Sequence, residues 1–278
     1  MTTLQMGPLR LELRSRTYLM GILNVTPDSF AGNGVMEVES AVARGRVMLA
    51  EGADIIDVGG ESTRPGAISV PLEEELRRVI PVVEHLVEEL GAPVSVDTRK
   101  AEVARQALRA GAGMVNDVSA LSADPQMAAV VAEARVPVVL MHMGMRSTEQ
   151  EQADGDVVTE IRVHLAERIE AAVAAGIPRE RILIDPGFGF GKTVKQNLEL
   201  LRRLGEFRAL GQPLLISTSR KGTIGKVLGG LQVEERVEGT AATVAVAIVH
   251  GVDIVRVHDV RVMVRVARMT DAIVRDIV

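Results

Sequence analysis

Acidic, amide, hydroxyl and histidine side chains recur in this sequence directly after short runs of β-branched and aliphatic residues. Eight polar residues hold such positions: Asn24, Asp57, Asp97, Asn116, His142, Asp185, Ser217 and His258. Carboxylates pair with the N–H groups of a polar heterocycle through charge-assisted hydrogen bonds. Cationic or protonatable residues near the same runs would bind an anionic group: Arg64, Lys221, Arg256 and His258. These residue types together predict a site for a flat polar heterocycle attached to a phosphate.

The segment after Asp57 combines glycine, hydroxyl and basic residues, and reads VGGESTRPG over residues 58–66. Gly59 and Gly60 allow a sharp turn or a close approach of the backbone to a ligand. Arg64 lies in a loop without a partner at helical spacing. It is therefore either a ligand-binding residue or a solvated loop arginine, and the sequence leaves both interpretations open.

Asp97 and Asn116 each allow two interpretations. Either residue could cap the helix that follows its strand, which is a common role of Asp and Asn at that position. The residue after Asp97, Thr98, is itself a good cap for a helix that begins near Lys100. Asp97 is therefore available for a ligand.

Residues 185–193 (DPGFGFGKT) resemble a phosphate-binding P-loop that follows a strand. The glycines are one residue too close together for the pattern GxxxxGK[ST], and Pro186 stands where the first glycine is required. We therefore reject nucleoside triphosphate hydrolysis. The segment is instead predicted to be a flexible loop that carries Asp185 and presents Phe188 and Phe190, rather than part of the core.

Basic residues also follow the last two predicted strands. Residues 217–222 (STSRKG) place hydroxyl groups and two cations at a helix start, where unpaired N–H groups and the helix dipole attract anions. Arg256 and His258 share one face by the two-residue period of a strand. Because barrel enzymes often bind phosphate at strands seven and eight, these residues predict an anion site. A basic surface loop is the weaker alternative.

Eight strand-like runs carry these residues, and the intervals between them have room for a loop and a helix. Such units form either a closed barrel or an open doubly wound sheet. An open sheet would concentrate its polar residues at one switch point, whereas here every run ends in one. We therefore predict an α/β fold of the (β/α)8 TIM-barrel class. The runs are residues 18–25, 54–58, 93–96, 114–118, 136–141, 181–184, 213–216 and 253–257.

Apolar stripes at helical spacing occupy the intervals. The stripe over residues 72–90 is ended by Gly91, and Pro81 inside it is expected to kink the helix. Residues 260–273 begin with valines that alternate as in a strand, but the later apolar residues and the barrel count favour a helix. The alternating residues 9–19 predict a short β-hairpin that closes the barrel floor.

The amino-acid composition limits the classes of protein and of site to which this chain can belong. The 278 residues suit one domain (1–278), and 47% hydrophobic residues exclude wholesale disorder. Without cysteine there is no disulfide, thiolate nucleophile or Cys-ligated zinc. No histidine cluster has transition-metal spacing, although Mg²⁺ remains possible because it relies on substrate phosphates. The net charge of −5 argues against nucleic-acid binding, and the lack of an apolar leader or a membrane-length run predicts a cytoplasmic protein.

Five of these segments together resemble the dihydropteroate synthase family, pterin-binding TIM-barrel enzymes of folate biosynthesis that sulfonamides inhibit. The resemblance covers roughly residues 18–275. One departure follows the first motif, where FAGNG replaces the family's usual FSDGG and the loop is a few residues shorter. The matching segments are residues 21–30 (GILNVTPDSF), 59–66 (GGESTRPG), 185–190 (DPGFGF), 219–221 (SRK) and 256–259 (RVHD).

The resemblance implies a transferase that condenses 6-hydroxymethyl-7,8-dihydropterin diphosphate with 4-aminobenzoate, with Mg²⁺ assisting. The products are 7,8-dihydropteroate and pyrophosphate. Asp97, Asp185 and Lys221 are implied as catalytic, and family members are typically homodimers. The residues implied to bind the pterin are Asp97, Asn116, Met141, Asp185, Lys221 and Arg256.

The resemblance also implies which residues bind the diphosphate and which bind 4-aminobenzoate. Diphosphate is implied to bind Asn24, Arg256 and His258, with Asn24 also near the metal. Two alternatives remain: a pterin-dependent methyltransferase of the same barrel family, whose substrate lacks a diphosphate, and a pterin-binding paralogue without catalysis. The residues implied to bind 4-aminobenzoate are Phe30, Thr63, Arg64, Pro65, Phe190, Ser219 and Lys221.

Overall fold

Eight parallel strands form one sheet that closes on itself. They are β3 (Tyr18–Asn24), β4 (Ile55–Gly59), β5 (Val94–Asp97), β6 (Met114–Asp117), β7 (Val138–Met141), β8 (Ile182–Asp185), β9 (Leu215–Ile216) and β10 (Ile254–Val257). The computed structural model describes residues 3–7, 9–25, 34–62, 69–144 and 155–276. The strand order is β8-β7-β6-β5-β4-β3-β10-β9, and a parallel bridge between Ile184 and Leu214 joins the two ends. The predicted barrel is therefore confirmed, and the open sheet is excluded.

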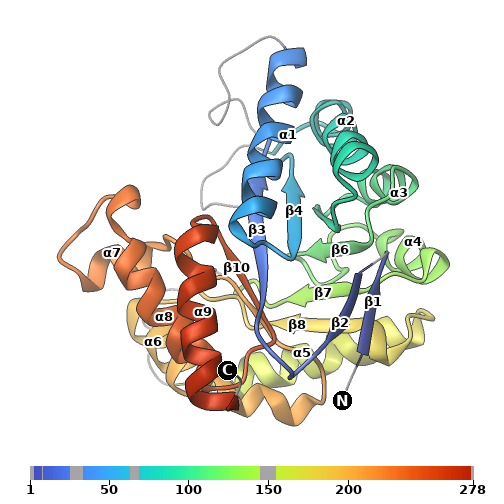
Figure 1. The fold of residues 1–278 in the computed structure, drawn as a ribbon. Coiled ribbons are helices and arrows are strands. Elements are labelled where there is room, and N and C mark those ends of the chain that lie inside the picture. The colour runs from blue at the N-terminus through green and yellow to red at the C-terminus, as the bar shows by residue number, and fades with distance from the viewer. Residues whose placement is uncertain (1–2, 8, 26–33, 63–68, 145–154, 277–278) are drawn as a thin grey trace.

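Helices surround the barrel (Figure 1). They are α1 (Gly34–Glu51), α2 (Leu72–Leu90), α3 (Ala101–Arg109), α4 (Met127–Ala134), α5 (Val157–Ala174), α6 (Val194–Arg202), α7 (Gly222–Val227), α8 (Val237–Val249) and α9 (Val260–Arg275). Short 3-10 helices are η1 (Arg179–Arg181), η2 (Leu204–Leu210) and η3 (Val233–Glu235). Within the described ranges, no helix has the length and apolar character needed to cross a membrane.

Both of the segments predicted as helices over residues 72–90 and 260–273 are helical. α2 runs through Pro81 to Leu90, and Gly91 caps it with φ 58° and an N–H that donates to the Val87 carbonyl at 3.0 Å. The last segment, α9, is a helix, as predicted for residues 260–273. Its buried residues recur every three or four positions, which is the period of a helix packed on one side: Val260, Met263, Val264 and Ala267.

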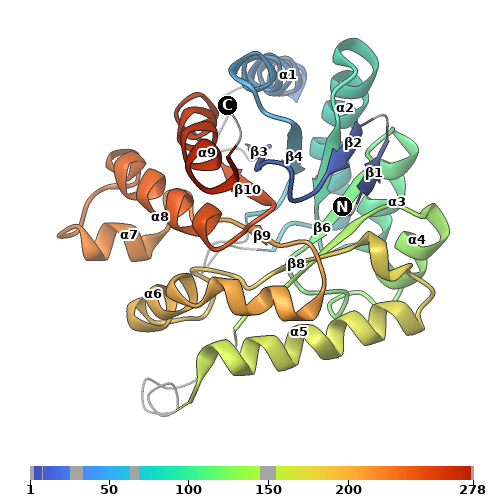
Figure 2. The same ribbon diagram turned by 60° about the horizontal axis from the view of Figure 1, so that its bottom comes forward.

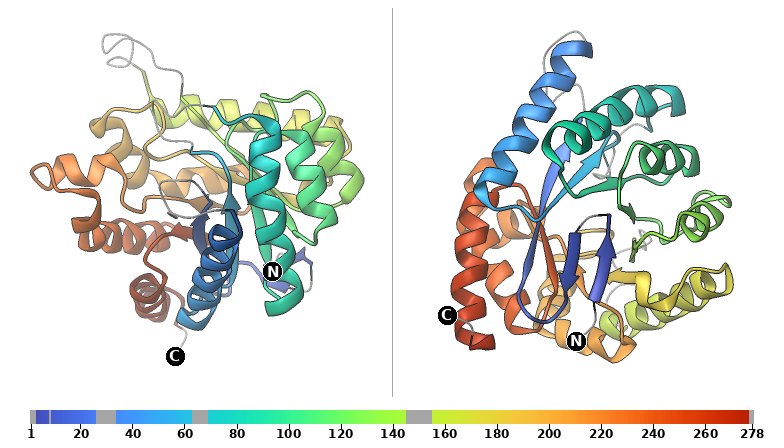
Figure 3. Two further views of the ribbon diagram at one scale, coloured as in Figure 1. Left: turned by 90° about the horizontal axis from the view of Figure 1, so that it is seen from above. Right: turned by 45° about the vertical axis from the view of Figure 1, so that its right-hand side comes forward.

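A two-stranded antiparallel hairpin covers the end of the barrel where the strands begin (Figures 2 and 3). It consists of β1 (Thr3–Met6) and β2 (Leu9–Glu12). The prediction of a hairpin at the barrel floor is confirmed, but its placement within residues 9–19 is wrong. Residues 9–12 pair with an upstream strand, and Tyr18 already belongs to the barrel. The side chains that form this apolar layer with the barrel are Leu4, Met6, Leu11, Leu13, Tyr18, Met20, Ile55, Met114, Val139, Leu183, Leu215 and Ile254.

The hairpin is expected to act as a stability element. Leu11 is 0% exposed, so Leu11→Ala removes buried apolar volume and is expected to lower the free energy of unfolding by about 2–5 kcal/mol. Urea unfolding would measure the change. Arg10→Ala, at the exposed neighbouring position of the same strand, is the matched control. Equal losses for the two variants would contradict a role for the hairpin in the core.

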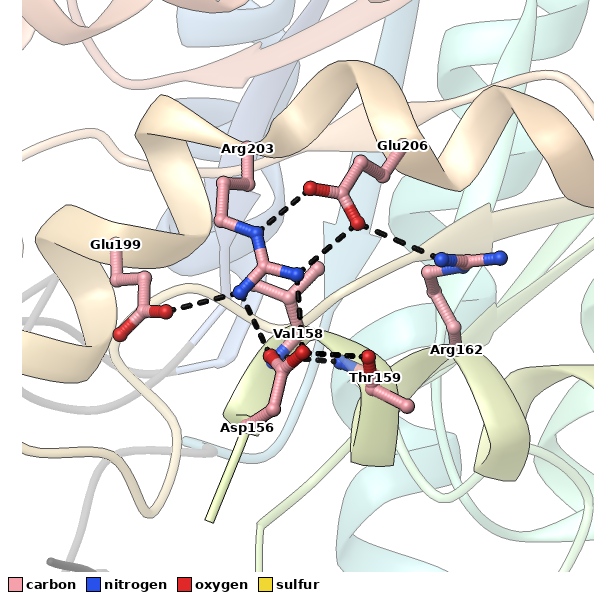
Figure 4. A network of polar contacts seen from close by, with 7 residues as sticks. All are labelled: Asp156, Val158, Thr159, Arg162, Glu199, Arg203 and Glu206. Carbon is pink, nitrogen blue, oxygen red and sulfur yellow. Dashed lines mark hydrogen bonds and ion pairs between the residues drawn. The ribbon is translucent and has the colours of Figure 1, made fainter. Parts of the chain in front are cut away.

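An ion-pair network fastens the start of α5 to the end of α6 (Figure 4). The Asp156 carboxylate accepts from the N–H groups of Val158 and Thr159 at 3.1 and 3.2 Å and so caps α5. The Arg203 guanidinium donates to Asp156 at 2.7 and 3.0 Å and to Glu206 at 2.6 Å. Hydrogen bonds from Arg203 and Thr159 lower the pKa of Asp156. Because exposed pairs contribute little to stability, the network mainly fixes where α5 begins.

Candidate active site

Polar side chains form a layer directly above the apolar layer of the barrel interior. Side chains alternate between the two faces of a strand. A polar residue two positions after an inward-facing apolar residue therefore also faces the barrel interior. Asp97 pairs in register with Asn116, and Met141 with Asp185. A pocket of about 870 Å³ opens at this end of the barrel, and seven predicted site residues line it: Asn24, Asp97, Phe190, Ser219, Lys221, Arg256 and His258.

The guanidinium group of Arg256 bridges two carboxylates across the strands. Its Nε donates to Asp57 Oδ2 at 2.6 Å and its Nη2 donates to Asp97 Oδ2 at 2.7 Å. Asn116 Nδ2 also donates to Asp57 Oδ2, at 3.0 Å. Asp57 is 0% exposed and holds both neighbours in place. The sequence analysis noted Asp57 at a strand end but did not include it among the site residues.

Neither Asp97 nor Asn116 caps a helix, because their side chains bind Arg256 and Asp57. The expectation that Thr98 caps the next helix is wrong. Thr98 Oγ1 accepts from the Lys100 N–H at 3.2 Å, and the helix itself begins at Ala101, whose N–H donates to Asp124 at 2.9 Å. The cap comes from a distant residue because the loop before α4 folds back onto the start of α3.

Burial controls the ionisation of the two acidic residues in the pocket. It raises the pKa of Asp97 to about 7, with Arg256 opposing the rise and Asp57 adding to it. It raises the pKa of Asp185 to about 6, although the Gly187 N–H donates to its Oδ1 at 2.7 Å and Lys221 lies nearby. Carboxylates with raised pKa values, clustered in a pocket, are typical of a functional site.

The glycine-rich loop after β8 separates its two phenylalanines. Phe190 lines the pocket, and the Lys221 ammonium lies 3.9 Å from the centre of its ring. The prediction that Phe188 is presented for ligand binding is wrong, because Phe188 is 1% exposed and belongs to the core. Gly189, between them, has φ 84°, and a Cβ there would lie 3.0 Å from Lys221 Cδ. This positive φ allows the turn between Phe188 in the core and Phe190 at the pocket.

The predicted anion site after β9 is formed in part. Ser219 Oγ lies 3.0 Å from His258 Nδ1 and accepts from the His258 N–H at 3.1 Å, so these two predicted residues are in contact. Lys221 precedes α7 directly. Arg220, the second cation of the predicted site, donates to the Asp259 carboxylate at 2.9 and 2.5 Å, so its charge is balanced within the protein.

The remaining predicted site residues differ in how deeply they are buried. Asn24 ends β3 at the pocket, partly exposed, whereas Asn116, Met141 and Asp185 lie deeper and are almost fully buried. In the parts of the chain that the structure describes, no group of three or more His, Asp or Glu side chains could hold a metal ion. Four predicted 4-aminobenzoate residues lie outside the described residues: Phe30, Thr63, Arg64 and Pro65.

Comparison with known proteins decides the family. The sequence profile of the pterin binding enzymes matches residues 20–258. The dihydropteroate synthase of Synechocystis is 47% identical over 275 residues, which cover 98% of this chain and 95% of the relative. The chain belongs to the dihydropteroate synthase family. The predicted membership is therefore confirmed, and the methyltransferase alternative is not supported.

Solved structures of dihydropteroate synthases agree with the barrel described above. The Xanthomonas albilineans dihydropteroate synthase with 4-aminobenzoic acid superposes with a TM-score of 0.90 at 48% identity, covering 98% of both chains. The same enzyme in complex with 7,8-dihydropteroate superposes with a TM-score of 0.88 at 47% identity, again covering 98% of both chains. These family members match the chain over nearly its whole length.

Proposed function

We propose that this chain condenses 6-hydroxymethyl-7,8-dihydropterin diphosphate with 4-aminobenzoate to give 7,8-dihydropteroate and pyrophosphate. The observation that carries the proposal is the buried set of Asp97, Asn116 and Asp185 next to a pocket that Asp97, Lys221 and Arg256 line. Buried carboxylates and an amide suit a neutral ring with many hydrogen-bonding groups, and the cations that line the pocket suit an anion. Solved relatives that contain 4-aminobenzoic acid and 7,8-dihydropteroate support the same substrates.

The pterin ring is proposed to bind in the deep part of the pocket. Asp97, Asn116 and Asp185 would contact the donors and acceptors of its edges, because a carboxylate facing a 2-amino pyrimidine edge forms a charge-assisted pair. Lys221 would donate to a ring acceptor. Met141 would pack on one ring face, and the Arg256 guanidinium would stack on the other.

The diphosphate is proposed to bind at Asn24, Arg256 and His258, which all line the pocket. Asn24 supplies one amide oxygen there. This suits Mg²⁺, which takes oxygen ligands and commonly combines one or two protein oxygens with substrate phosphates and water. When bound, Mg²⁺ would neutralise charge on the leaving diphosphate.

The 4-aminobenzoate is proposed to lie between the Phe190 ring and the aliphatic stem of Lys221. Both side chains line the pocket as neighbours, and the Lys221 ammonium, 3.9 Å from the ring centre, would move off the ring face to admit the substrate. The Ser219 hydroxyl, just before α7, would meet the substrate carboxylate. Phe30 and residues 63–65 complete the subsite by analogy with the family.

We propose a dissociative reaction order. The C–O bond to the diphosphate breaks first, and its electron pair leaves with the diphosphate, so the pterin methylene becomes cationic. Asp97 and Asp185 stabilise that charge, which is the largest task of the site. The neutral arylamine nitrogen then forms the C–N bond and releases a proton to water. No general base is required, because a neutral arylamine is already nucleophilic.

Pyrophosphate release tests the proposed reaction. The protein is assayed with the dihydropterin diphosphate, with and without 4-aminobenzoate and with and without Mg²⁺. Steady turnover is expected only with both additions. Pyrophosphate release that does not depend on 4-aminobenzoate, or no release at all, would reject the synthase activity.

Activity is expected to fall on the acid side of neutrality. Asp97 and Asp185, whose pKa values are raised to about 7 and about 6, must be ionised to accept ring N–H groups. Protonation as the pH drops through this range removes acceptors from the free enzyme, so kcat/KM for the dihydropterin diphosphate is expected to decline. A profile between about pH 5 and 9 would measure it. A value that stays constant from pH 8 down to about pH 6 would contradict the assignment.

We also propose that the chain forms a homodimer. Neighbouring helices α8 and α9 expose apolar side chains, with Val249 at 60%, Met269 at 63% and Ile273 at 69% exposure. Such a patch is typical of a surface that another protein covers. Sedimentation equilibrium is expected to give a dimer, and the paired change Val249→Glu with Ile273→Glu is expected to give monomer. A wild-type monomer at micromolar concentration would contradict the proposal.

A further inference from the structure

Lys192 is the lysine of the segment that resembles a P-loop in sequence, but its ammonium group binds the protein itself. Nζ donates to the carbonyl oxygens of Gly187 at 2.8 Å, Phe190 at 3.1 Å and His142 at 3.4 Å. It also lies 3.1 Å from His142 Nδ1. A P-loop lysine directs its charge at a phosphate. Here the ammonium group instead hydrogen-bonds both ends of the Gly187–Phe190 turn and His142, the residue that follows β7.

The groups around Lys192 are arranged to receive a cation. Burial lowers the pKa of His142 to about 3, with Lys192 adding to the effect, so the imidazole is neutral and Nδ1 can accept. Burial lowers the pKa of Lys192 to about 7, although Asp185 opposes this. The desolvation cost is therefore large, and several acceptors must offset it. A neutral apolar residue at this position could not donate these hydrogen bonds, and so would not hold the surrounding groups in the same arrangement.

The loop lies too close to the end of β7 for a side chain at Gly187. Gly187 has φ 72°, and a Cβ on it would overlap the His142 carbonyl oxygen. The Phe190 N–H donates to the Gly187 carbonyl at 3.1 Å, which closes the turn. Lys192 therefore holds the backbone of Phe190 through its carbonyl, and the Phe190 ring is the side chain that faces Lys221.

We propose that Lys192 is a positioning residue for the arylamine subsite: its ammonium holds the 187–190 turn against the end of β7 and so fixes the Phe190 ring opposite Lys221. The proposal rests on the proposed function in assigning 4-aminobenzoate to a subsite formed by these two side chains. It gives a role to a lysine whose sequence motif had pointed only to a rejected nucleotide site.

A fluorescent reporter tests the positioning without substrates. The chain has no tryptophan, so Phe190→Trp places one indole emitter on the turn, which is excited selectively over the single tyrosine, Tyr18. Adding Lys192→Met is expected to raise acrylamide quenching of that emitter by about twofold or more, because the turn loses its attachment to β7. Adding Lys195→Met instead changes an exposed lysine three residues away and is expected to have no effect. Equal quenching with and without Lys192 would overturn the proposal.

Kinetics then separate positioning from general damage. In the otherwise unchanged chain, Lys192→Met is expected to raise KM for 4-aminobenzoate by about tenfold, with a much smaller change in KM for the dihydropterin diphosphate. Parallel increases in both KM values would overturn the proposal. If Lys192→Met does not fold, as judged by circular dichroism, Lys192→Gln replaces it with the same expected direction. Failure of the wild-type chain to use 4-aminobenzoate would reject the proposed function instead, and the quenching result would still decide the role of Lys192 in holding the turn.

Discussion

Lys221→Ala is expected to lower kcat/KM for both substrates by about 10²–10³-fold. The ammonium of Lys221 lies over the Phe190 ring and close enough to Asp185 to oppose the rise in pKa that burial causes there. In the proposed complex it donates to the pterin, and its stem covers the aminobenzoate. Truncation removes a charged donor and one wall of the arylamine subsite together. Steady-state pyrophosphate release, with each substrate varied in turn, would measure the loss.

Lys195→Ala is the control for this variant, because it removes a lysine of equal charge from the exposed face of α6. Its kinetic constants are expected to match those of the unchanged chain. A loss for Lys221→Ala that is no larger than that for Lys195→Ala would refute the assignment of Lys221 to the site.

Asp185→Asn is expected to lower kcat/KM by about 10²–10³-fold while the protein stays folded. The substituted amide keeps the shape of the side chain and an oxygen that can accept from the Gly187 N–H. It removes the negative charge that is proposed to pair with the pterin edge and to stabilise the cationic methylene. The same pyrophosphate assay would measure the loss, and Asp156→Asn, at an exposed helix start, would serve as the control.

Thermal unfolding distinguishes this effect from misfolding. Because burial raises the pKa of Asp185 to about 6 in the folded chain, ionisation there is less favourable than in the unfolded chain. Its contribution to stability is fully present below the unfolded pKa and is lost as the pH rises through the folded pKa. Asp185→Asn is therefore expected to keep or raise Tm above that pH. A lower Tm together with the kinetic loss would point to damaged folding rather than to lost charge.

Local patterns accounted for most of the barrel and for the position of its site. Each strand is a short β-branched run, and a polar residue at its end must lie at the same end of the sheet as the others, because the strands are parallel. Asp97, Asn116 and Asp185 could therefore be grouped by their positions in the sequence. The same reasoning assigned the final segment to a helix, which the buried face of α9 confirms.

Partners distant in sequence could not be read from such patterns. Asp57 contacts Asn116 and Arg256 across the barrel, at separations of 59 and 199 residues. The cap of α3 likewise comes from Asp124 rather than from the adjacent Thr98. Pairing of this kind depends on how the strands and loops are arranged in space, and no local period encodes that arrangement.

The sequence alone determined that polar groups gather at the C-terminal ends of a closed barrel, since the two-residue strand period and the strand count are local properties of the chain. Only the tertiary structure decided what each group at that end does. It turned Phe188 into the core and Phe190 toward Lys221, although both share one glycine-rich motif. It also directed Lys192 at three backbone carbonyls rather than at a ligand. These outcomes depend on side-chain direction and burial, which are set by packing among elements far apart in the chain.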